Sequence, residues 1–394
     1  MIIFALMFTA VIGGIHFYLW KRLISDTRPS RRVKIVGTVL IVMLALSIPG
    51  TMIFSRSVSP DLTATIATVP LLWLGTVLFL MVSLILFDCY FLIRFLARKF
   101  AQARQSNDNT VTDPSKRDSL RKFAAVGTLG LSGTLTTASH LAVMQKPTVI
   151  HQQFVLSRLP PELNGLKIAQ LSDIHIGLTL DSAYLSQVVQ QTNALAPDVI
   201  VITGDLIDGY VSKMKDDILP VTRLKAPMGV YFVTGNHEYY FNAEEWVDAL
   251  KEMGIVVLDN RSVPLGSGQF PLMLAGVNDF EAHRFPQSES LNLARALEGR
   301  HRNQEVILLC HQPKIIQEAA NADVGLVLSG HTHGGQIWPF NYLVKLQQPY
   351  IKGKIRYTHR THLYINQGTG YWGPPMRLGT VSEITLITLH NKEN

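Results

Sequence analysis

Apolar residues in the C-terminal half of this 394-residue chain form five short runs, each followed at once by polar residues or glycine. Short aliphatic runs bounded in this way are typical of buried β-strands. Apolar spacing typical of helices follows several of the runs, at residues 181–194, 243–253 and 314–322. Alternating strands and helices predict an α/β domain. The predicted strands are residues 166–172, 199–203, 230–234, 306–310 and 324–328.

The first 145 residues show longer apolar runs, long enough to cross a bilayer as helices. Three are nearly free of charge: Met1–Trp20, Ile35–Phe54 and Val69–Phe91. A fourth, Phe123–Met144, is weaker because it is rich in Gly, Ser, Thr and Ala. We therefore expect an N-terminal bundle of three to four transmembrane helices. Three spans would occupy residues 1–99, a polar linker centred on Gln102–Asp118 and the fourth span or a signal-like segment would fill residues 100–145, and a globular domain would occupy residues 146–394.

Two of these segments could also act as export signals. The basic residues near Met1–Trp20 follow the apolar run instead of preceding it, which favours an anchor over a cleaved signal peptide. The segment Ser115–Lys122 resembles a twin-arginine signal in which Lys replaces the first Arg, and a basic cluster beside the membrane is an equal alternative. No clear Ala-x-Ala site follows His140, which argues against cleavage.

The distribution of charge predicts an orientation in the membrane. Residues 1–145 contain 15 Lys and Arg against 6 Asp and Glu, whereas residues 146–394 contain 21 against 23. The high pI therefore comes from the membrane half and gives no reason to expect nucleic-acid binding. Six basic residues lie in Lys21–Lys34 and eight in Arg94–Lys122, whereas the loop between the second and third spans has only Arg56. The positive-inside rule then predicts a multi-pass protein of the inner or plasma membrane with its globular domain outside the cytoplasm.

Few polar or reactive groups interrupt the predicted spans. Asp88 is the one acid inside a span, and its closeness to the basic residues from Arg94 onward places it at the interface. Cys89 lies in a span and Cys310 at a buried strand end, so we expect no structural disulfide between them.

Each predicted strand of the C-terminal half is followed by a residue that can ligate a metal ion. Ligands gather at the carboxyl ends of strands in α/β folds, so five strand ends can converge on one cleft. The donors are oxygen and imidazole nitrogen without thiolate, which suits Mn, Fe or Zn. A single such motif is more often a turn, so only the ordered set supports the inference. The motifs are Asp173-Ile174-His175, Gly204-Asp205, Gly235-Asn236-His237-Glu238, His311 and Gly330-His331-Thr332-His333.

Over about residues 165–390 this order resembles the signature of the calcineurin-like metallophosphoesterases. The resemblance implies a four-layer α/β/β/α sandwich that hydrolyses phosphoric esters by attack of a hydroxide shared between two divalent metal ions. It assigns His237 to the chemistry, facing the leaving oxygen, with support of a metal ligand as the alternative role. It assigns one ion to Asp173, His175, Asp205 and His333, and the other to Asp205, Asn236, His311 and His331, so that Asp205 is shared.

Two later segments, Gly334–Pro339 and Asn366–Arg377, resemble the membrane-associated subgroup of that family, which includes UDP-diacylglucosamine hydrolases of lipid A synthesis. Arg377 would contact phosphate or, as an equal alternative, cap a glycine-rich turn on the surface. Tyr342–Tyr357 mixes basic and aromatic residues and could rest on anionic headgroups, although a solvated hairpin is favoured.

The sequence therefore predicts a membrane-anchored dinuclear phosphoesterase that cleaves a phosphodiester or pyrophosphate bond in a lipid or lipid-linked substrate. A UDP-diacylglucosamine pyrophosphatase is the closest alternative, weakened by the outside orientation because that nucleotide substrate is expected in the cytoplasm. A non-catalytic membrane sensor or transport-associated metal-binding protein is disfavoured by the complete ligand set and by His237. The chain has no Gly-x-Ser-x-Gly motif, which excludes the α/β-hydrolase type of serine hydrolase.

Overall fold

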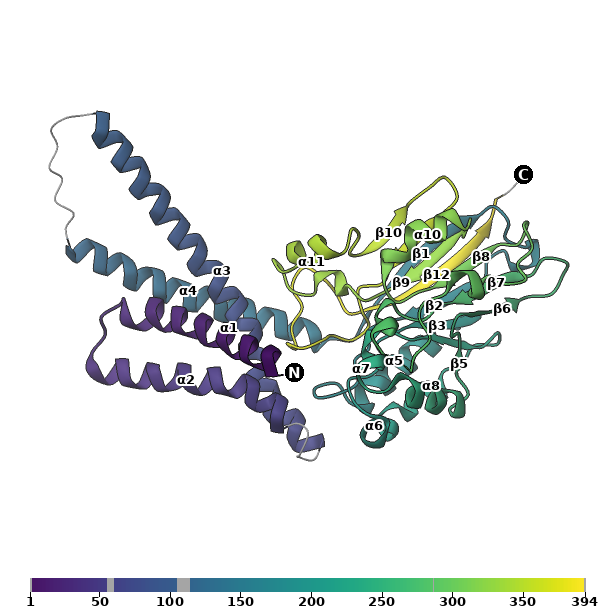
Figure 1. The fold of residues 1–394 in the computed structure, drawn as a ribbon, viewed down its shortest axis with the longest axis horizontal. Coiled ribbons are helices and arrows are strands. Elements are labelled where there is room, and N and C mark those ends of the chain that lie inside the picture. The colour runs from purple at the N-terminus through teal and green to yellow at the C-terminus, as the bar shows by residue number, and fades with distance from the viewer. Residues whose placement is uncertain (1, 55–59, 105–113, 286, 393–394) are drawn as a thin grey trace. The chain divides into compact units, whose positions relative to one another are not determined.

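The chain folds into two compact units, residues 1–140 and 141–394, and each is described by itself. The computed structural model describes residues 2–54, 60–104, 114–285 and 287–392 (Figure 1). The first unit is helical, and the second contains the strands.

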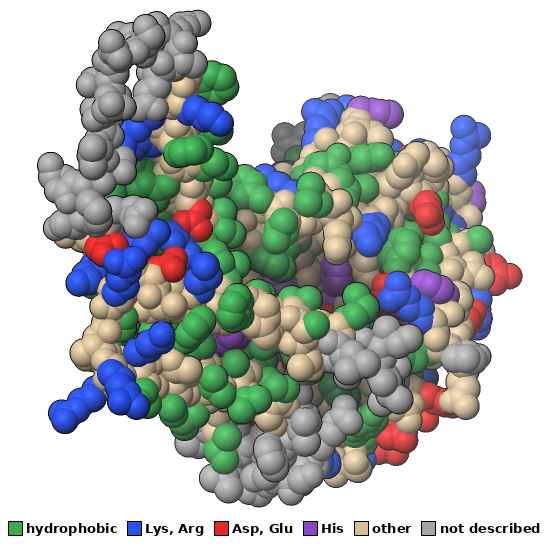
Figure 2. Space-filling model, turned by 60° about the vertical axis from the view of Figure 1, so that its left-hand side comes forward, with side chains coloured by type: hydrophobic (Ala, Val, Ile, Leu, Met, Phe, Trp, Pro, Cys, Tyr) green, Lys and Arg blue, Asp and Glu red, His purple; other side chains and the backbone are tan. Residues whose placement is uncertain are grey.

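The helical unit carries many apolar side chains on its surface. Its described residues form α1 (Ile2–Trp20), the π-helical turn η1 (Lys21–Ser25), α2 (Arg31–Phe54), α3 (Pro60–Arg104) and most of α4 (Pro114–Val143). Val36, Met43 and Leu86 are among the exposed large apolar residues, and hydrophobic side chains are spread over the surface seen in Figure 2. Exposed apolar helices of this length suit a lipid environment better than water.

Two helical segments among the described residues are long and apolar enough to cross a membrane, Arg31–Thr51 and Ile66–Phe100. They overlap the second and third predicted spans, so among the described residues length and composition support only two of the expected three to four spans. Phe123–Met144 lies almost wholly within α4, where its Gly, Ser and Thr content makes the helix too polar to qualify. Met1–Trp20 falls in α1, but Met1 lies outside the described residues and only part of this segment has described side chains.

Helix also occupies both ends of the predicted linker. α3 ends at Arg104 and α4 begins at Pro114, and residues 105–113 lie outside the described part of the chain.

Within the helical unit, Asp88 accepts a hydrogen bond of 2.8 Å from the Tyr18 hydroxyl and pairs with Arg22. The acid in the span is therefore balanced by a cation from η1, the turn that follows α1.

The second unit is built on two six-stranded sheets. The first has the order β1 (Thr148–Leu156), β12 (Glu383–Asn391), β2 (Lys167–Leu171), β3 (Val199–Thr203), β4 (Val230–Val233) and β5 (Val256–Val257). The second has the order β10 (Gly353–Arg356), β11 (His362–Ile365), β9 (Leu326–Ser329), β8 (Val306–Leu309), β7 (Leu272–Gly276) and β6 (Arg261–Leu265). Neighbours pair in parallel except β12 with β2, β6 with β7 and β10 with β11.

Three hydrophobic clusters define the layers of this unit. One lies between the sheets and joins residues such as Val201 of β3 to Leu328 of β9. A second packs the outer face of the first sheet against α5 (Ser182–Ala194), α6 (Val211–Ile218) and α8 (Ala243–Glu252). A third packs the second sheet against α9 (Leu293–Ala296) and α10 (Ile316–Asn321). The result is the helix–sheet–sheet–helix order that the family resemblance implies.

The five predicted strands that precede the motifs all form, as β2, β3, β4, β8 and β9. Every residue of β3 is buried, because helices cover one face of its sheet and the second sheet covers the other. Since β2, β3 and β4 run parallel, as do β8 and β9, their carboxyl ends deliver the motif residues to one edge of each sheet.

Candidate metal centre

Five of the motif residues, in the loops directly after the strands, have a strained backbone conformation. Asp173, His175, Asp205, His331 and His333 have φ values of 50°, 53°, 52°, 69° and 49°. Residues with a Cβ rarely adopt this left-handed conformation, which costs about 1–3 kcal/mol at each position. Such strain persists only where the surrounding structure enforces it, and its concentration at one edge marks this edge as a functional site.

Glycines let the motif loops approach one another. A Cβ on Gly330 would lie 1.9 Å from Ser172 Oγ and 2.1 Å from Asp173 Oδ2. A Cβ on Gly235 would lie 2.2 Å from Asp205 Oδ1. Any side chain at either position would therefore push a carboxylate away from the centre.

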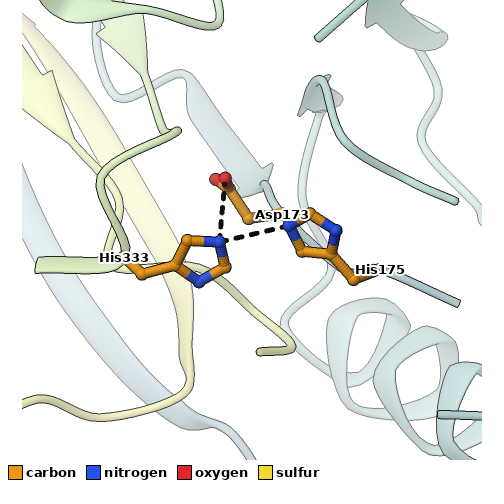
Figure 3. Close-up of side chains that lie close together, drawn as sticks. All are labelled: Asp173, His175 and His333. Carbon is orange, nitrogen blue, oxygen red and sulfur yellow. Dashed lines mark hydrogen bonds and ion pairs between the residues drawn. The ribbon is translucent and has the colours of Figure 1, made fainter. Parts of the chain in front are cut away.

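Asp173, His175 and His333 form one group of donors (Figure 3). His333 Nε2 lies 3.4 Å from Asp173 Oδ1 and 3.1 Å from His175 Nε2. The Nδ1–H of His175 donates to Asp208 Oδ1 over 3.0 Å, so its Nε2 presents a lone pair in the neutral form. A carboxylate oxygen and two imidazole nitrogens thus converge, as the ligands of one cation would.

Asp205, His311 and His331 form a second group, with Asn236 beside it. His311 Nδ1–H donates to the carbonyl of Thr203 over 2.8 Å, which leaves Nε2 with a lone pair in the neutral ring. That Nε2 faces Asp205 Oδ2 and His331 Nδ1, each at 3.1 Å, and Asn236 Oδ1 at 3.2 Å. These acceptor atoms repel one another unless a cation or a proton lies among them, so the residues fit a metal ion.

The carboxylate of Asp205 lies next to both groups. Its Oδ2 is 3.1 Å from His311 Nε2 and 3.8 Å from His175 Nε2. Its Oδ1 accepts a hydrogen bond of 2.9 Å from the backbone N–H of His237. A buried carboxylate between two groups of imidazoles is what two neighbouring cations need as a shared ligand.

The electrostatics of the centre also suit metal binding. Burial and the charge of His311 lower the pKa of His331 to about 3. Burial and the neighbouring His175 lower the pKa of His333 well below its usual range, so both rings are neutral and able to ligate. Burial acts in the same direction on His311, but the Asp205 carboxylate raises its pKa well above the usual value. A proton on His311 thus takes the place of a cation, and metal binding would release it.

Comparison with known proteins agrees with this geometry. Residues 166–335 match the family described as calcineurin-like phosphoesterase. The chain is 34% identical over 388 residues to a Danio rerio protein named "Transmembrane protein with metallophosphoesterase domain", covering 94% of this chain and 85% of that protein. It is 36% identical over 277 residues to an uncharacterized metallophosphoesterase of Helicobacter pylori, covering 70% and 72%. The chain belongs to the calcineurin-like phosphoesterase family.

Membership makes the protein a phosphoesterase hydrolase, and calcineurin-like phosphoesterases use two divalent metal ions. A Bos taurus protein of the same name as the Danio rerio relative is 38% identical over 284 residues, covering 69% of this chain and 64% of that protein. The names of these relatives specify neither a substrate nor the identity of the metals.

His237 of this phosphoesterase lies beside the two groups of donors, 4.0 Å from Asp205 Oδ2 through its Nε2. Its ring contacts those of Trp372 and Tyr240, with centroid distances of 5.6 Å and 5.2 Å, and both aromatic side chains are exposed. Burial lowers the pKa of His237, but the carboxylates of Asp205 and Asp208 outweigh it and raise the pKa to about 9. Bound cations would oppose that increase.

Two acidic residues hold the centre together in ways that the motifs did not reveal. Asp208 Oδ1 accepts hydrogen bonds from Nδ1 of His175 at 3.0 Å and of His237 at 2.5 Å. Burial raises its pKa, but the two imidazoles lower it below the usual range, so Asp208 is ionised. Glu238 accepts from the backbone N–H groups of Gly235, Asp205 and Leu206, which fixes two motif loops to each other.

Arg377 has a structural role in this protein. It is buried, and its guanidinium donates to the carbonyls of Gln367, Gly368 and Gly370 over 2.6–3.0 Å. The predicted phosphate contact is therefore not supported. The alternative of a turn-capping arginine is correct, except that the side chain is buried and not on the surface.

Replacing Asp208 by Asn tests whether it orients the two imidazoles. An amide keeps one acceptor oxygen but loses the charge that favours two N–H donors, and loss of a partner that orients a metal ligand typically costs about 10–100-fold in activity or metal affinity. We expect Asp208→Asn to lower kcat for bis-p-nitrophenyl phosphate by about that factor. The circular dichroism spectrum should stay unchanged. Asp248→Asn, at an exposed position of α8, is the matched control; a wild-type rate for Asp208→Asn would contradict the orienting role.

Proposed function

We propose that this chain is a membrane-anchored dinuclear phosphoesterase that cleaves a phosphodiester or pyrophosphate bond in a lipid or lipid-linked substrate. One ion would be held by Asp173, His175, Asp205 and His333, and the other by Asp205, Asn236, His311 and His331. The observation that carries the assignment is the position of Asp205 Oδ2 between His311 Nε2 and His175 Nε2, at 3.1 Å and 3.8 Å.

Two divalent cations at these positions, of Mn, Fe or Zn, would supply Lewis-acid activation of water and neutralise phosphoryl charge. The protein contributes a donor set with limited negative charge. Neutral imidazoles and the Asn236 carbonyl oxygen complete the ligands around two carboxylates, Asp173 and Asp205, so an anionic phosphoester is not repelled by an excess of acid.

His237 is the residue we assign to proton transfer. Its Nδ1–H is engaged by Asp208, and its Nε2 lies 4.0 Å from Asp205 Oδ2. A ring held in this way presents one nitrogen to the reacting phosphate. A protonated Nε2 can stabilise charge on the leaving oxygen or donate the proton that this oxygen needs.

Membrane anchoring is supported by the two apolar segments in α2 and α3 and by relatives named as transmembrane proteins. Tethering raises the local concentration of substrates that reside in the same bilayer, which favours a lipid or lipid-linked phosphoester. A UDP-diacylglucosamine pyrophosphatase stays an alternative prediction for a domain located in the cytoplasm.

The side of the membrane on which the catalytic domain lies depends on whether α4 crosses the bilayer. If α2 and α3 were the only spans, basic residues before the first and after the second would leave the catalytic domain in the cytoplasm. Residues 123–144 contain no Asp, Glu, Lys or Arg and follow the basic stretch Arg94–Lys122. We propose that this uncharged stretch carries the chain across once more, so that the domain lies outside.

Removing Asp205 tests the shared ligand. Asp205→Ala should abolish hydrolysis of bis-p-nitrophenyl phosphate and lower the bound metal, measured by plasma emission spectrometry, because both ions lose a ligand. Asp205→Asn, which keeps the shape of the side chain, should lose activity as well. Asp216→Ala, at an exposed position on α6, should match the wild type. Full activity with two bound ions in either Asp205 variant would disprove the assignment.

Removing His237 separates catalysis from metal binding. General acid help is worth about 10²–10⁴-fold, so His237→Ala should lose roughly that much in kcat for an alkyl phosphodiester while keeping both ions. The loss should shrink for p-nitrophenolate, which leaves without a proton. His359→Ala, at an exposed position, serves as control. Equal losses with good and poor leaving groups would reduce His237 to a positioning role.

Reporter fusions test the orientation in a bacterial host. Alkaline phosphatase folds only outside the cytoplasm, so it should be active when fused after Asn394 and inactive when fused after Ser30, which lies in the first basic loop. A green fluorescent protein fused after Ser30 should fluoresce. Alkaline phosphatase that is inactive after Asn394 as well as after Ser30 would place the domain in the cytoplasm and favour the UDP-diacylglucosamine alternative.

A further inference from the structure

A compact set of large apolar side chains lies on the surface just after the last metal-ligand motif. The set surrounds α11 (Asn341–Gln347), a short helix with no buried residue. Monomeric soluble proteins rarely expose so many large apolar groups together, and such patches mark interaction sites. We name this set the α11 patch, and its members and exposed fractions are Trp338 48%, Phe340 46%, Tyr342 60%, Leu343 55% and Leu346 82%.

The α11 patch is linked to the metal centre by backbone and by hydrogen bonds. The short helix η6 (His333–Gly335) leads from a ligand residue directly into it. Gln336 donates to the carbonyls of Trp372 and Pro374 at 2.9 Å and 3.2 Å and accepts from the N–H of Trp372 at 3.0 Å. The N–H of Trp338 donates to Leu378 over 2.9 Å. The segment that carries the patch is therefore tied to the loop whose Trp372 ring covers His237.

The chain segment that carries the α11 patch is basic. From Val324 to Ser382 it has six Lys and Arg and no Asp or Glu, of which Arg377 is buried and Arg360 pairs with Glu305 and Asp323. Lys345 lies over the ring of Tyr342, 5.9 Å from its centroid, and exposed Lys352 donates to the carbonyl of Gly379 over 3.0 Å. Trp and Tyr together with Lys are the side chains enriched where proteins meet the interface of a bilayer.

We propose that the α11 patch docks on the surface of an anionic lipid bilayer. The apolar side chains would enter the boundary between headgroups and acyl chains, and Lys345 and Lys352 would contact the headgroup charges. The proposal rests on the membrane anchoring of the proposed function, which keeps the catalytic domain near a bilayer. It deepens that function, since a lipid phosphoester could then reach His237 past Trp372 without leaving the membrane surface.

Charge distinguishes a bilayer from a second copy of the chain. A two-fold contact through this patch would place one acid-free basic segment against another and so bring like charges together. An anionic bilayer complements the same charges and accommodates the apolar side chains as well.

Fluorescence in vesicles tests the contact with the full-length chain. In a Cys89→Ser background, where the remaining Cys310 is buried, Leu346→Cys would carry an environment-sensitive label. The protein would be reconstituted into vesicles of phosphatidylcholine and phosphatidylglycerol. The matched control is Leu219→Cys, at an exposed leucine of η3 (Leu219–Arg223) in the same unit.

The label at position 346 should be blue-shifted and quenched by doxyl lipids with a shallow spin label, about five-fold more than the label at 219. It should be protected from iodide, and its protection should fall in pure phosphatidylcholine. Equal access of iodide to both labels would overturn the proposal. Protection of position 346 from both quenchers would overturn it too, because protein would then cover the patch.

A variant of the patch links docking to activity. Leu343→Ser with Leu346→Ser should cleave soluble bis-p-nitrophenyl phosphate at the wild-type rate but phosphatidyl-p-nitrophenol in anionic vesicles about five-fold more slowly. Leu219→Ser should behave as wild type on both. No selective loss on vesicles would contradict docking. A wild-type protein inactive on bis-p-nitrophenyl phosphate would instead contradict the proposed function, while the fluorescence result still decides docking.

Discussion

The structure of the site depends on one buried carboxylate, that of Asp205, at the end of the fully buried strand β3. Its Oδ2 lies beside an imidazole of each donor group, and its Oδ1 accepts the backbone N–H of His237. A buried carboxylate without compensating charge is costly, so this position requires cations or protonated imidazoles around it. The convergence of both sheets on one edge provides them, because β2 and β9 bring Asp173 and His333 to one side and β8 brings His311 to the other.

The free-energy cost of placing this buried carboxylate among the other donors is distributed over the loops that follow the strands. Five motif residues hold left-handed backbone, and Glu238 ties the loops of β3 and β4 together through three backbone N–H groups. Burial and the neighbouring Asp205 raise the pKa of Glu238 to about 7, so this carboxyl group also depends on the charge at the centre. Asp208 then aligns the rings of His175 and His237. The left-handed backbone of the motif residues, the hydrogen bonds of Glu238 and the alignment of the two rings by Asp208 together preorganise the donors before any ion binds.

The sequence predicted the features that produce a local pattern of residue types, and it missed those that arise from contacts between residues far apart in the chain. Aliphatic runs predicted β2, β3, β4, β8 and β9, and the polar residues after them lie together as expected. The four layers came from the family resemblance.

Asp208 was missed because one acid three residues after a ligand has no distinctive spacing, and its role arises from two distant histidines. Two of the three to four predicted membrane helices are supported by length and composition, whereas Gly, Ser and Thr make Phe123–Met144 too polar to meet the same criterion. The favoured hairpin in Tyr342–Tyr357 was only partly right: β10 pairs with β11, but α11 precedes it, and its exposed apolar residues lack the one-sided pattern that identifies a packed helix.

The central claim is that one carboxylate lies between two metal ions in contact with both groups of imidazoles. Low-temperature electron paramagnetic resonance of the full-length protein loaded with two Mn²⁺ per chain tests it most directly, because ions that share a ligand are magnetically coupled. The account predicts the multiline spectrum of an exchange-coupled pair at full loading. Two independent mononuclear Mn²⁺ signals at the same loading would contradict it.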